Sequence, residues 1–147
     1  MNVTIRRAES GDANAIAGCL AELGYETPAS LVTSKLSTLT ASAADGVLVA
    51  IEPDAGLVGV VSVHLLPLFH APGNLARVTA LAVRKDHQRR GVGRALVAAA
   101  EVFAWRHDCR RVEVTSGDHR SEAHDFYKGL GYQTDERRFI KHGPPAV

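Results

Sequence analysis

One segment of the chain limits the possible folds more than any other, because it reads as strand, loop, helix and strand in immediate succession. Residues 76–83 are an apolar run, a helical pattern extends from about Val92 to His107, and a strand pattern covers residues 111–115. Two strands joined through a helix lie parallel in one sheet, because the crossover returns the chain to the same end. The second half of the chain is therefore expected to contain a parallel strand pair with a helix packed on one face.

The remaining patterns extend this unit to a larger mixed sheet. They predict strands over residues 3–7 and 138–141 and helices over residues 10–24, 28–42 and 120–130. They also predict a hairpin of two strands over residues 47–51 and 58–65. The order is β-α-α-β-β-β-α-β-α-β, which predicts an α/β fold with helices on both faces of the sheet. We expect one domain over residues 3–142 and a flexible C-terminal tail at 143–147.

Composition removes several classes of function. Seventeen Lys and Arg against sixteen Asp and Glu give a net charge of +1, which lacks the basic footprint of a nucleic-acid binder. The sequence contains no apolar run long enough to span a membrane and no signal-peptide pattern at its start. Cys19 and Cys109 fit neither a disulfide framework nor a zinc site, and the seven His show no metal-binding spacing. We therefore expect a cytoplasmic protein without a metal.

The loop before the long helix concentrates the residues suited to binding an anion. Gly91 and Gly93 open the helix, so backbone and ligand can approach each other closely. The first four N–H groups of a helix have no partner inside it and lie at the positive end of its dipole. Arg89, Arg90 and Arg94 add positive charge at the same end. Together these features predict a binding site for a diphosphate.

Two common phosphate-binding motifs do not fit these residues. A P-loop requires Gly-Lys-Ser or Gly-Lys-Thr after the turn, and the sequence lacks it. A dinucleotide fingerprint requires a small third residue at the position of Leu96. The diphosphate therefore belongs to another class of ligand.

Two motifs carry a resemblance to a known family. Gln88, Gly91 and Gly93 match the Q/R-x-x-G-x-G/A signature of the GNAT superfamily of acyl-CoA N-acyltransferases. Residues 123–132 resemble the A-x-x-F-Y-x-x-x-G-F/Y segment of the same superfamily. The motifs stand in the family's order with one strand between them, and the similarity covers essentially residues 3–142.

The resemblance implies a splay between the two central parallel strands, in which acetyl-CoA binds as the acyl donor. The pantetheine arm is expected to pair with the backbone at the end of the first strand, and the pyrophosphate to bind at the helix start. The residues that we assign to the donor on this basis are Leu81, Ala82, Val83, Gln88, Arg89, Arg90, Gly91, Val92, Gly93, Arg94, Ala95 and Arg120.

The implied reaction is direct transfer of the acetyl group to a primary amine of a small molecule. Tyr127 stands at the family's catalytic tyrosine and is predicted to return a proton to the departing thiolate. Many members carry a glutamate as general base where this sequence has Thr79, which cannot act as a base. Glu113 is the first candidate for that role, with a histidine acting directly or through water as the alternative: His64, His70, His119 or His124. His64, His70 and Thr79 are also assigned to the acceptor pocket.

Several alternatives remain open from the sequence. Arg120 stands where the family often has Asn, and it suits either the cofactor phosphates or an anionic acceptor. With the residues around it and near the C-terminus, it is similar to aminoalkylphosphonate N-acetyltransferases, although a solvated basic face explains the same residues. A protein N-terminal or lysine acetyltransferase and a non-catalytic acyl-CoA sensor are the alternative functions. The resemblance also implies a homodimer.

Overall fold

The computed structural model describes residues 2–115, 121–135 and 138–145. The chain forms two compact units, Met1–Thr115 and Ser116–Val147. The first contains a five-stranded sheet and the helices α1 to α3, and the second contains the helix α4 (Ser121–Gly129).

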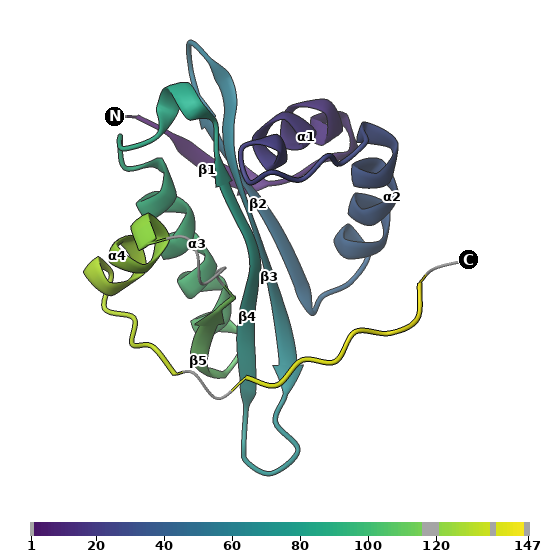
Figure 1. Ribbon diagram of the computed structural model, residues 1–147, viewed down its shortest axis with the longest axis vertical. Coiled ribbons are helices and arrows are strands. Elements are labelled where there is room, and N and C mark those ends of the chain that lie inside the picture. The colour runs from purple at the N-terminus through teal and green to yellow at the C-terminus, as the bar shows by residue number, and fades with distance from the viewer. Residues whose placement is uncertain (1, 116–120, 136–137, 146–147) are drawn as a thin grey trace. The chain divides into compact units, whose positions relative to one another are not determined.

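The sheet follows the chain order without a strand being inserted out of sequence. Its strands are β1 (Thr4–Arg7), β2 (Asp45–Glu52), β3 (Gly56–Pro67), β4 (Asn74–Val83) and β5 (Cys109–Val114). Strands β1 to β4 pair antiparallel, whereas β4 and β5 pair parallel (Figure 1). The predicted parallel pair at the crossover is thereby confirmed.

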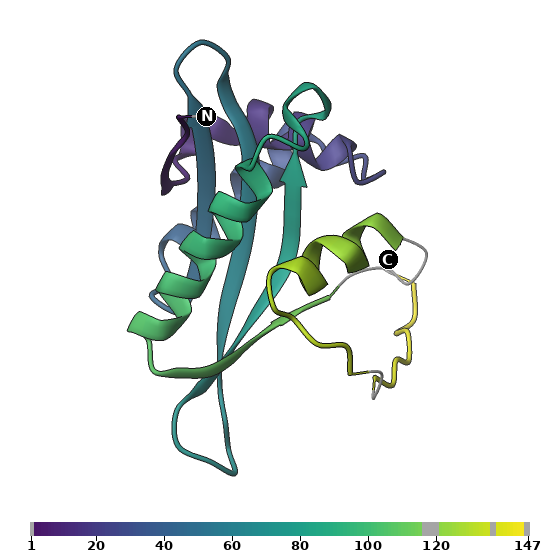
Figure 2. The ribbon, with the colours of Figure 1, turned by 90° about the vertical axis from the view of Figure 1, so that its left-hand side faces the viewer.

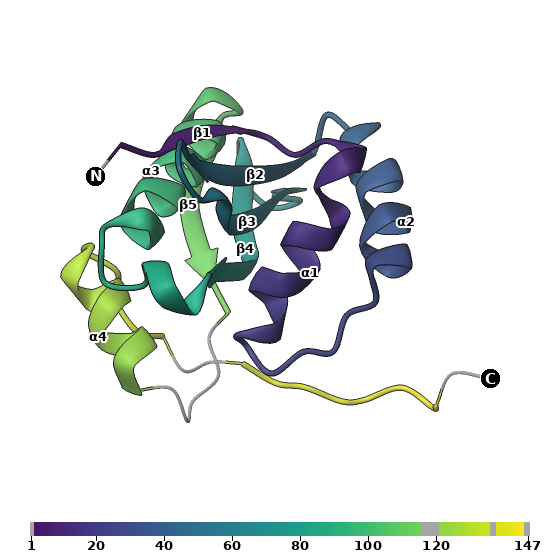
Figure 3. The same ribbon diagram turned by 90° about the horizontal axis from the view of Figure 1, so that it is seen from above.

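Helices cover both faces of this sheet, as Figure 3 shows from above. Helices α1 (Ala13–Ala21) and α2 (Ala29–Thr40) pack on one face, and α3 (Val92–Arg106) packs on the other. Successive side chains of a strand point to opposite faces of the sheet. Val60 of β3 therefore packs in the core that includes α1 and α2, and Val61 packs in the core that includes α3. None of the described helices has both the length and the hydropathy that crossing a lipid bilayer requires.

The last predicted strand is wrong. Residues 138–141 carry no strand, and Phe139 and Ile140 are 98% and 58% exposed. A strand needs the backbone of a neighbour to satisfy its N–H and C=O groups, and the described part of the second unit offers α4 but no strand. The sequence pattern alone therefore overestimated the order of this segment. The predicted helix over 120–130 is present as α4, while Arg120 lies outside the described residues.

Candidate active site

Strands β4 and β5 separate partway along their length. Their pairing extends from Asn74 opposite Cys109 to Val78 opposite Val114, and the Thr115 N–H donates to the Val78 carbonyl at 3.4 Å. Strand β4 continues to Val83 and, among the described residues, its last four positions pair only with β3. Figure 2 shows β5 diverging from β4. The predicted splay is present, and it leaves backbone polar groups of β4 without a strand partner.

A β-bulge lies where the splay begins. Ser62 on β3 stands opposite Ala80, but the next residue, Val63, stands opposite Val78. Thr79 is therefore the extra residue of β4. A bulge bends its strand and redirects side chains, and bulges are frequent beside active sites. Among the described residues, Thr79 is also the first position of β4 beyond its pairing with β5.

Four polar side chains from three strands meet at this bulge, and we call them the polar chain: Asp45, His64, Thr79 and Ser62. The Thr79 hydroxyl lies 2.8 Å from His64 Nε2 and 2.8 Å from the Ser62 hydroxyl. His64 Nδ1 lies 2.6 Å from Asp45 Oδ1. The structure thus brings together two of the predicted acceptor residues, His64 and Thr79, and joins them to a carboxylate that the sequence analysis missed.

The carboxyl group of Asp45 is held in its ionised form. Burial alone would raise the pKa of Asp45, but hydrogen bonds with His64 and Ser42 outweigh burial, and the pKa lies below its ordinary value. Asp45 precedes the apolar run that predicted its strand, so no local pattern marks it. Its role depends on strand register, which places it directly opposite His64.

Glu113, the predicted base, is engaged by two arginines. Arg77 Nη2 lies 2.9 Å from one carboxylate oxygen, and Arg111 Nε lies 2.8 Å from the other. Burial would raise the pKa of Glu113, but these two hydrogen bonds outweigh it and lower the pKa. The two hydrogen bonds and the lowered pKa make Glu113 a weak proton acceptor. The geometry therefore favours a different base.

His70 is separated from the other predicted acceptor residues. It is exposed in the loop between β3 and β4, before Asn74. Thr79 lies five positions beyond Asn74 on β4, which corresponds to roughly 16 Å along an extended strand. His70 thus stands at the opposite end of β4 from the splay.

The start of α3 has the backbone geometry that the sequence predicted. Gly91 caps the helix with a φ of +85°, a left-handed conformation that glycine adopts without strain. The Ala95 N–H donates to the Gly91 carbonyl at 3.0 Å, which leaves the preceding N–H groups of the first turn directed out of the helix start. Arg90 and Arg94 are exposed beside them. This arrangement is suited to an anion.

Gln88, the first residue of the signature, has a structural contact. Its side-chain amide donates to the Val83 carbonyl at 3.0 Å, so it ties the loop to the end of β4. Arg89 follows in a left-handed conformation with a φ of +63°. Gln88 therefore fixes the path of the loop between the splayed strand and the helix start.

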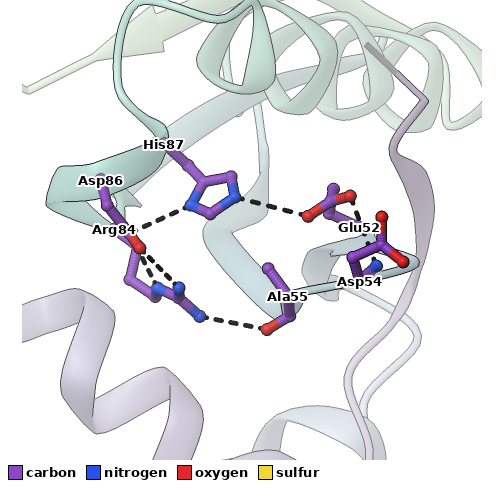
Figure 4. A network of polar contacts seen from close by, with 6 residues as sticks. All are labelled: Glu52, Asp54, Ala55, Arg84, Asp86 and His87. Atoms are coloured by element: carbon purple, nitrogen blue, oxygen red, sulfur yellow. Dashed lines mark hydrogen bonds and ion pairs between the residues drawn. The ribbon is translucent and has the colours of Figure 1, made fainter.

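A polar network fastens the same loop to the turn between β2 and β3 (Figure 4). Arg84 makes a paired contact with Asp86, at 3.0 and 2.7 Å, and donates to the Ala55 carbonyl at 3.1 Å. The buried His87 lies between two carboxylates, with Asp86 at 3.0 Å from Nδ1 and Glu52 at 3.4 Å from Nε2. Hydrogen bonds with Arg84 and then His87 hold the pKa of Asp86 well below its usual range. The network makes the loop a defined structure rather than a free connection.

We expect the replacement His87→Leu to loosen this loop. It removes both contacts of a buried side chain, which is expected to cost about 1–2 kcal/mol of unfolding free energy and to weaken coenzyme A binding about 3- to 10-fold. Urea unfolding and calorimetric titration with coenzyme A measure the two effects. Lys85→Ala, at an exposed neighbouring residue, is the control, and equal behaviour of both variants would contradict the assigned role.

The second unit presents Tyr127 on α4. Its ring packs edge-on against those of Phe126 and Tyr132, with centroids 5.0 and 5.7 Å away. The Tyr132 N–H donates to the Tyr127 carbonyl at 3.0 Å. Burial raises the pKa of Tyr127 to about 12. The phenol therefore keeps its proton at neutral pH, as a general acid must.

Comparison with known proteins identifies a family. Residues 19–132 match the model of the acetyltransferase (GNAT) family. No curated protein matches the chain by sequence.

Solved structures share the fold at low sequence identity. A transcriptional regulator from Bacillus halodurans has a TM-score of 0.86 at 23% identity, over 97% of this chain and 100% of that chain. An aminoglycoside acetyltransferase from an uncultured soil metagenomic sample, solved with sisomicin, has a TM-score of 0.79 at 20% identity over 98% and 97%. An aminoglycoside N-acetyltransferase solved with CoA has a TM-score of 0.83 at 15% identity over 97% and 95%. Because the family model spans most of the sequence and the fold agrees, this chain belongs to the GNAT acetyltransferase family.

Proposed function

We propose that the protein transfers the acetyl group of acetyl-CoA to a primary amine of a small molecule. The observation that carries this proposal is the free part of β4, which leads through a fixed loop directly into the start of α3. A long ligand with an amide-containing arm and a diphosphate has matching partners along this path, first backbone polar groups and then helix N–H groups.

The residues present fit such a donor. Leu81, Ala82 and Val83 belong to the free part of β4, and their backbone would pair with the pantetheine amides. The N–H groups from Arg89 to Arg94 would hold the pyrophosphate, aided by the positive charge of the exposed arginines. The bound donor supplies a thioester, whose thiol leaving group has a pKa of about 8.5 and needs modest assistance.

Tyr127 is proposed as the general acid that gives its proton to the departing sulfur. The role requires a phenol that is protonated at neutral pH when the sulfur leaves, and Tyr127 meets that requirement. The assignment rests on the family motif around Tyr127 and on the chemistry of a protonated phenol. Homodimer formation and a cytoplasmic location stay predictions.

The small-molecule acceptor is supported by two structural relatives that are aminoglycoside acetyltransferases, one of them solved with sisomicin. An acceptor screen tests the proposal: purified protein, acetyl-CoA, and a panel of sisomicin, other aminoglycosides, aminophosphonates, simple amines and peptides, with free thiol as the readout. We expect a small-molecule amine to stimulate thiol release. Stimulation by peptides alone would indicate a protein acetyltransferase. Coenzyme A binding without stimulation by any amine would indicate a sensor.

The variant Tyr127→Phe separates catalysis from donor binding. We expect turnover to fall about 100-fold, within the usual range for loss of a general acid, while the affinity for coenzyme A stays the same because the ring is kept. Steady-state thiol release and calorimetry provide the two measurements. Tyr25→Phe, at an exposed tyrosine in the first unit, is the matched control. Undiminished turnover in Tyr127→Phe would remove this residue from the mechanism.

A further inference from the structure

When His64 is neutral, the hydrogen bonds that link Asp45, His64 and Thr79 have a single direction of donation. A carboxylate only accepts, so Asp45 places the ring hydrogen of a neutral His64 on Nδ1. Nε2 is then an acceptor, and the Thr79 hydroxyl must donate its hydrogen to it. The oxygen of Thr79 keeps lone pairs that accept from Ser62 or from another N–H or O–H donor.

The location of the polar chain in the sheet also bears on its role. Thr79 is exposed and is the first residue of β4 beyond its pairing with β5, whereas His64 and Asp45 are each 22% exposed. The three side chains thus lead from a solvent-accessible hydroxyl at the splay to a partly buried hydrogen bond between His64 and Asp45. A solvated polar cluster would not require an extra residue in the strand, but the bulge at Thr79 brings its hydroxyl to His64.

We propose that Asp45, His64 and Thr79 form a proton relay that deprotonates the acceptor ammonium before it attacks the thioester. This role rests on the N-acetyltransferase function proposed above. His64 is the base, Thr79 conducts the proton, and Asp45 is a positioning residue that fixes the ring tautomer and stabilises the imidazolium that forms.

The protons and bonds balance in this scheme. One N–H bond of the ammonium breaks as its proton passes to the Thr79 oxygen, while the Thr79 hydrogen passes to His64 Nε2. The neutral amine forms the new bond between nitrogen and the acyl carbon, and the bond between that carbon and sulfur breaks. The nitrogen loses its second proton to solvent water, Tyr127 gives its proton to the thiolate and regains one from water, and the imidazolium later returns its proton to water. The net products are the amide, the free thiol and one proton.

The charged groups around His64 are compatible with this role. Asp45 on β2 favours the imidazolium, and Arg77 stands opposite His64 on β4 and opposes it. Glu113 on β5 accepts hydrogen bonds from Arg77, which offsets that positive charge. The hydrogen bond from Arg77 also makes Glu113 a poor base. The proposed base, His64, lies on β3, which is on the other side of β4 from Glu113.

The first test is the pH dependence of the variant His64→Gln. With the fastest small-molecule acceptor of the panel, beginning with sisomicin, we expect kcat/KM to fall about 100-fold at pH 7. The deficit should shrink below about 10-fold near pH 9.5, where about a quarter of a primary amine with a pKa of about 10 is already neutral in solution. A purely structural defect would reduce the rate equally at both values. An equal loss, or no loss, would overturn the proposal.

The second test uses matched changes at the conducting hydroxyl. Thr79→Val keeps the shape and removes the hydroxyl, so it should reproduce the pH-dependent loss, whereas Thr79→Ser should stay within about 3-fold of the original rate. Thr33→Val removes an exposed hydroxyl of α2 that donates to the Ala29 carbonyl at 3.0 Å, and it serves as the control. Equal rates for Thr79→Val and Thr79→Ser would contradict proton conduction.

A spectroscopic test keeps this proposal separate from the proposed function. Two-bond ¹H–¹⁵N spectra of the full chain report the ring tautomer without any acceptor. We expect neutral His64 to carry its hydrogen on Nδ1, and Asp45→Asn to change the tautomer populations. Hydrogen on Nε2 would overturn the relay even if the enzyme is active. Failure of every amine to stimulate thiol release would instead overturn the proposed function, and the relay with it, whatever the tautomer.

Discussion

Gly91→Val is expected to weaken coenzyme A binding by at least about 100-fold, which corresponds to about 2.7 kcal/mol. Gly91 has a φ of +85°, and a β-branched residue is a strained outlier in that conformation. Relieving the strain would turn the backbone that precedes α3 and misalign the N–H groups at the helix start. Calorimetric titration with coenzyme A measures the loss.

A matched variant shows whether backbone conformation is the cause. Gly91→Asn adds a side chain of similar size at a residue type that tolerates left-handed geometry, and a Cβ at this position meets nothing within 4 Å. We expect its affinity to remain within about 10-fold of the original. If Gly91→Val binds coenzyme A as well as the unchanged protein does, the start of α3 is not the donor site. If both variants lose binding equally, side-chain bulk rather than φ is responsible.

Gly59→Val should destabilise the first unit by about 3 kcal/mol, at the upper end of overpacking effects. A Cβ on Gly59 would lie 2.8 Å from Leu96 Cδ1 and 3.1 Å from Val92 Cγ1, and both of these side chains are fully buried on α3. Neither side chain can move aside without disturbing the packing of the helix on the sheet. Chemical denaturation followed by circular dichroism measures the change in unfolding free energy.

This contact also links the core to the candidate site, because Val92 is the first residue of α3. We expect Gly59→Val to weaken coenzyme A binding in the protein that remains folded. Gly18→Ala is the control for the glycine change itself: Gly18 is exposed on α1, its added Cβ meets nothing within 4 Å, and alanine is preferred inside a helix by roughly 0.5–1 kcal/mol. A neutral Gly59→Val would show that α3 does not pack as closely as the structure indicates.

The sequence predicted the elements whose signals are local. The apolar run at β4, the glycines at the start of α3 and the apolar stripe of α3 all lie within about 30 residues, and their order required a parallel crossover. The same locality explains the error at residues 138–141, because a strand exists only with a partner and no local pattern reports whether one is present.

The candidate base was decided by contacts between strands. The sequence favoured Glu113 because it is a carboxylate on the expected strand, but it could not show that Arg77 and Arg111 neutralise that group. It assigned His64 to the acceptor pocket and left it among the possible bases without a partner, because Asp45 is 19 residues away in the chain. Both facts depend on which residues face each other across the sheet.

The amino-acid sequence by itself therefore determined the family, the sheet with helices on both faces and the glycine-capped start of α3, because short-range periodicity and two motifs encode them. Only the tertiary structure showed that Thr79 occupies a bulge, that His64 contacts Asp45, and that β5 does not pair with the end of β4. The physical reason is register: a shift of one residue between paired strands turns every side chain to the other face, and that alignment is fixed by packing across the whole sheet.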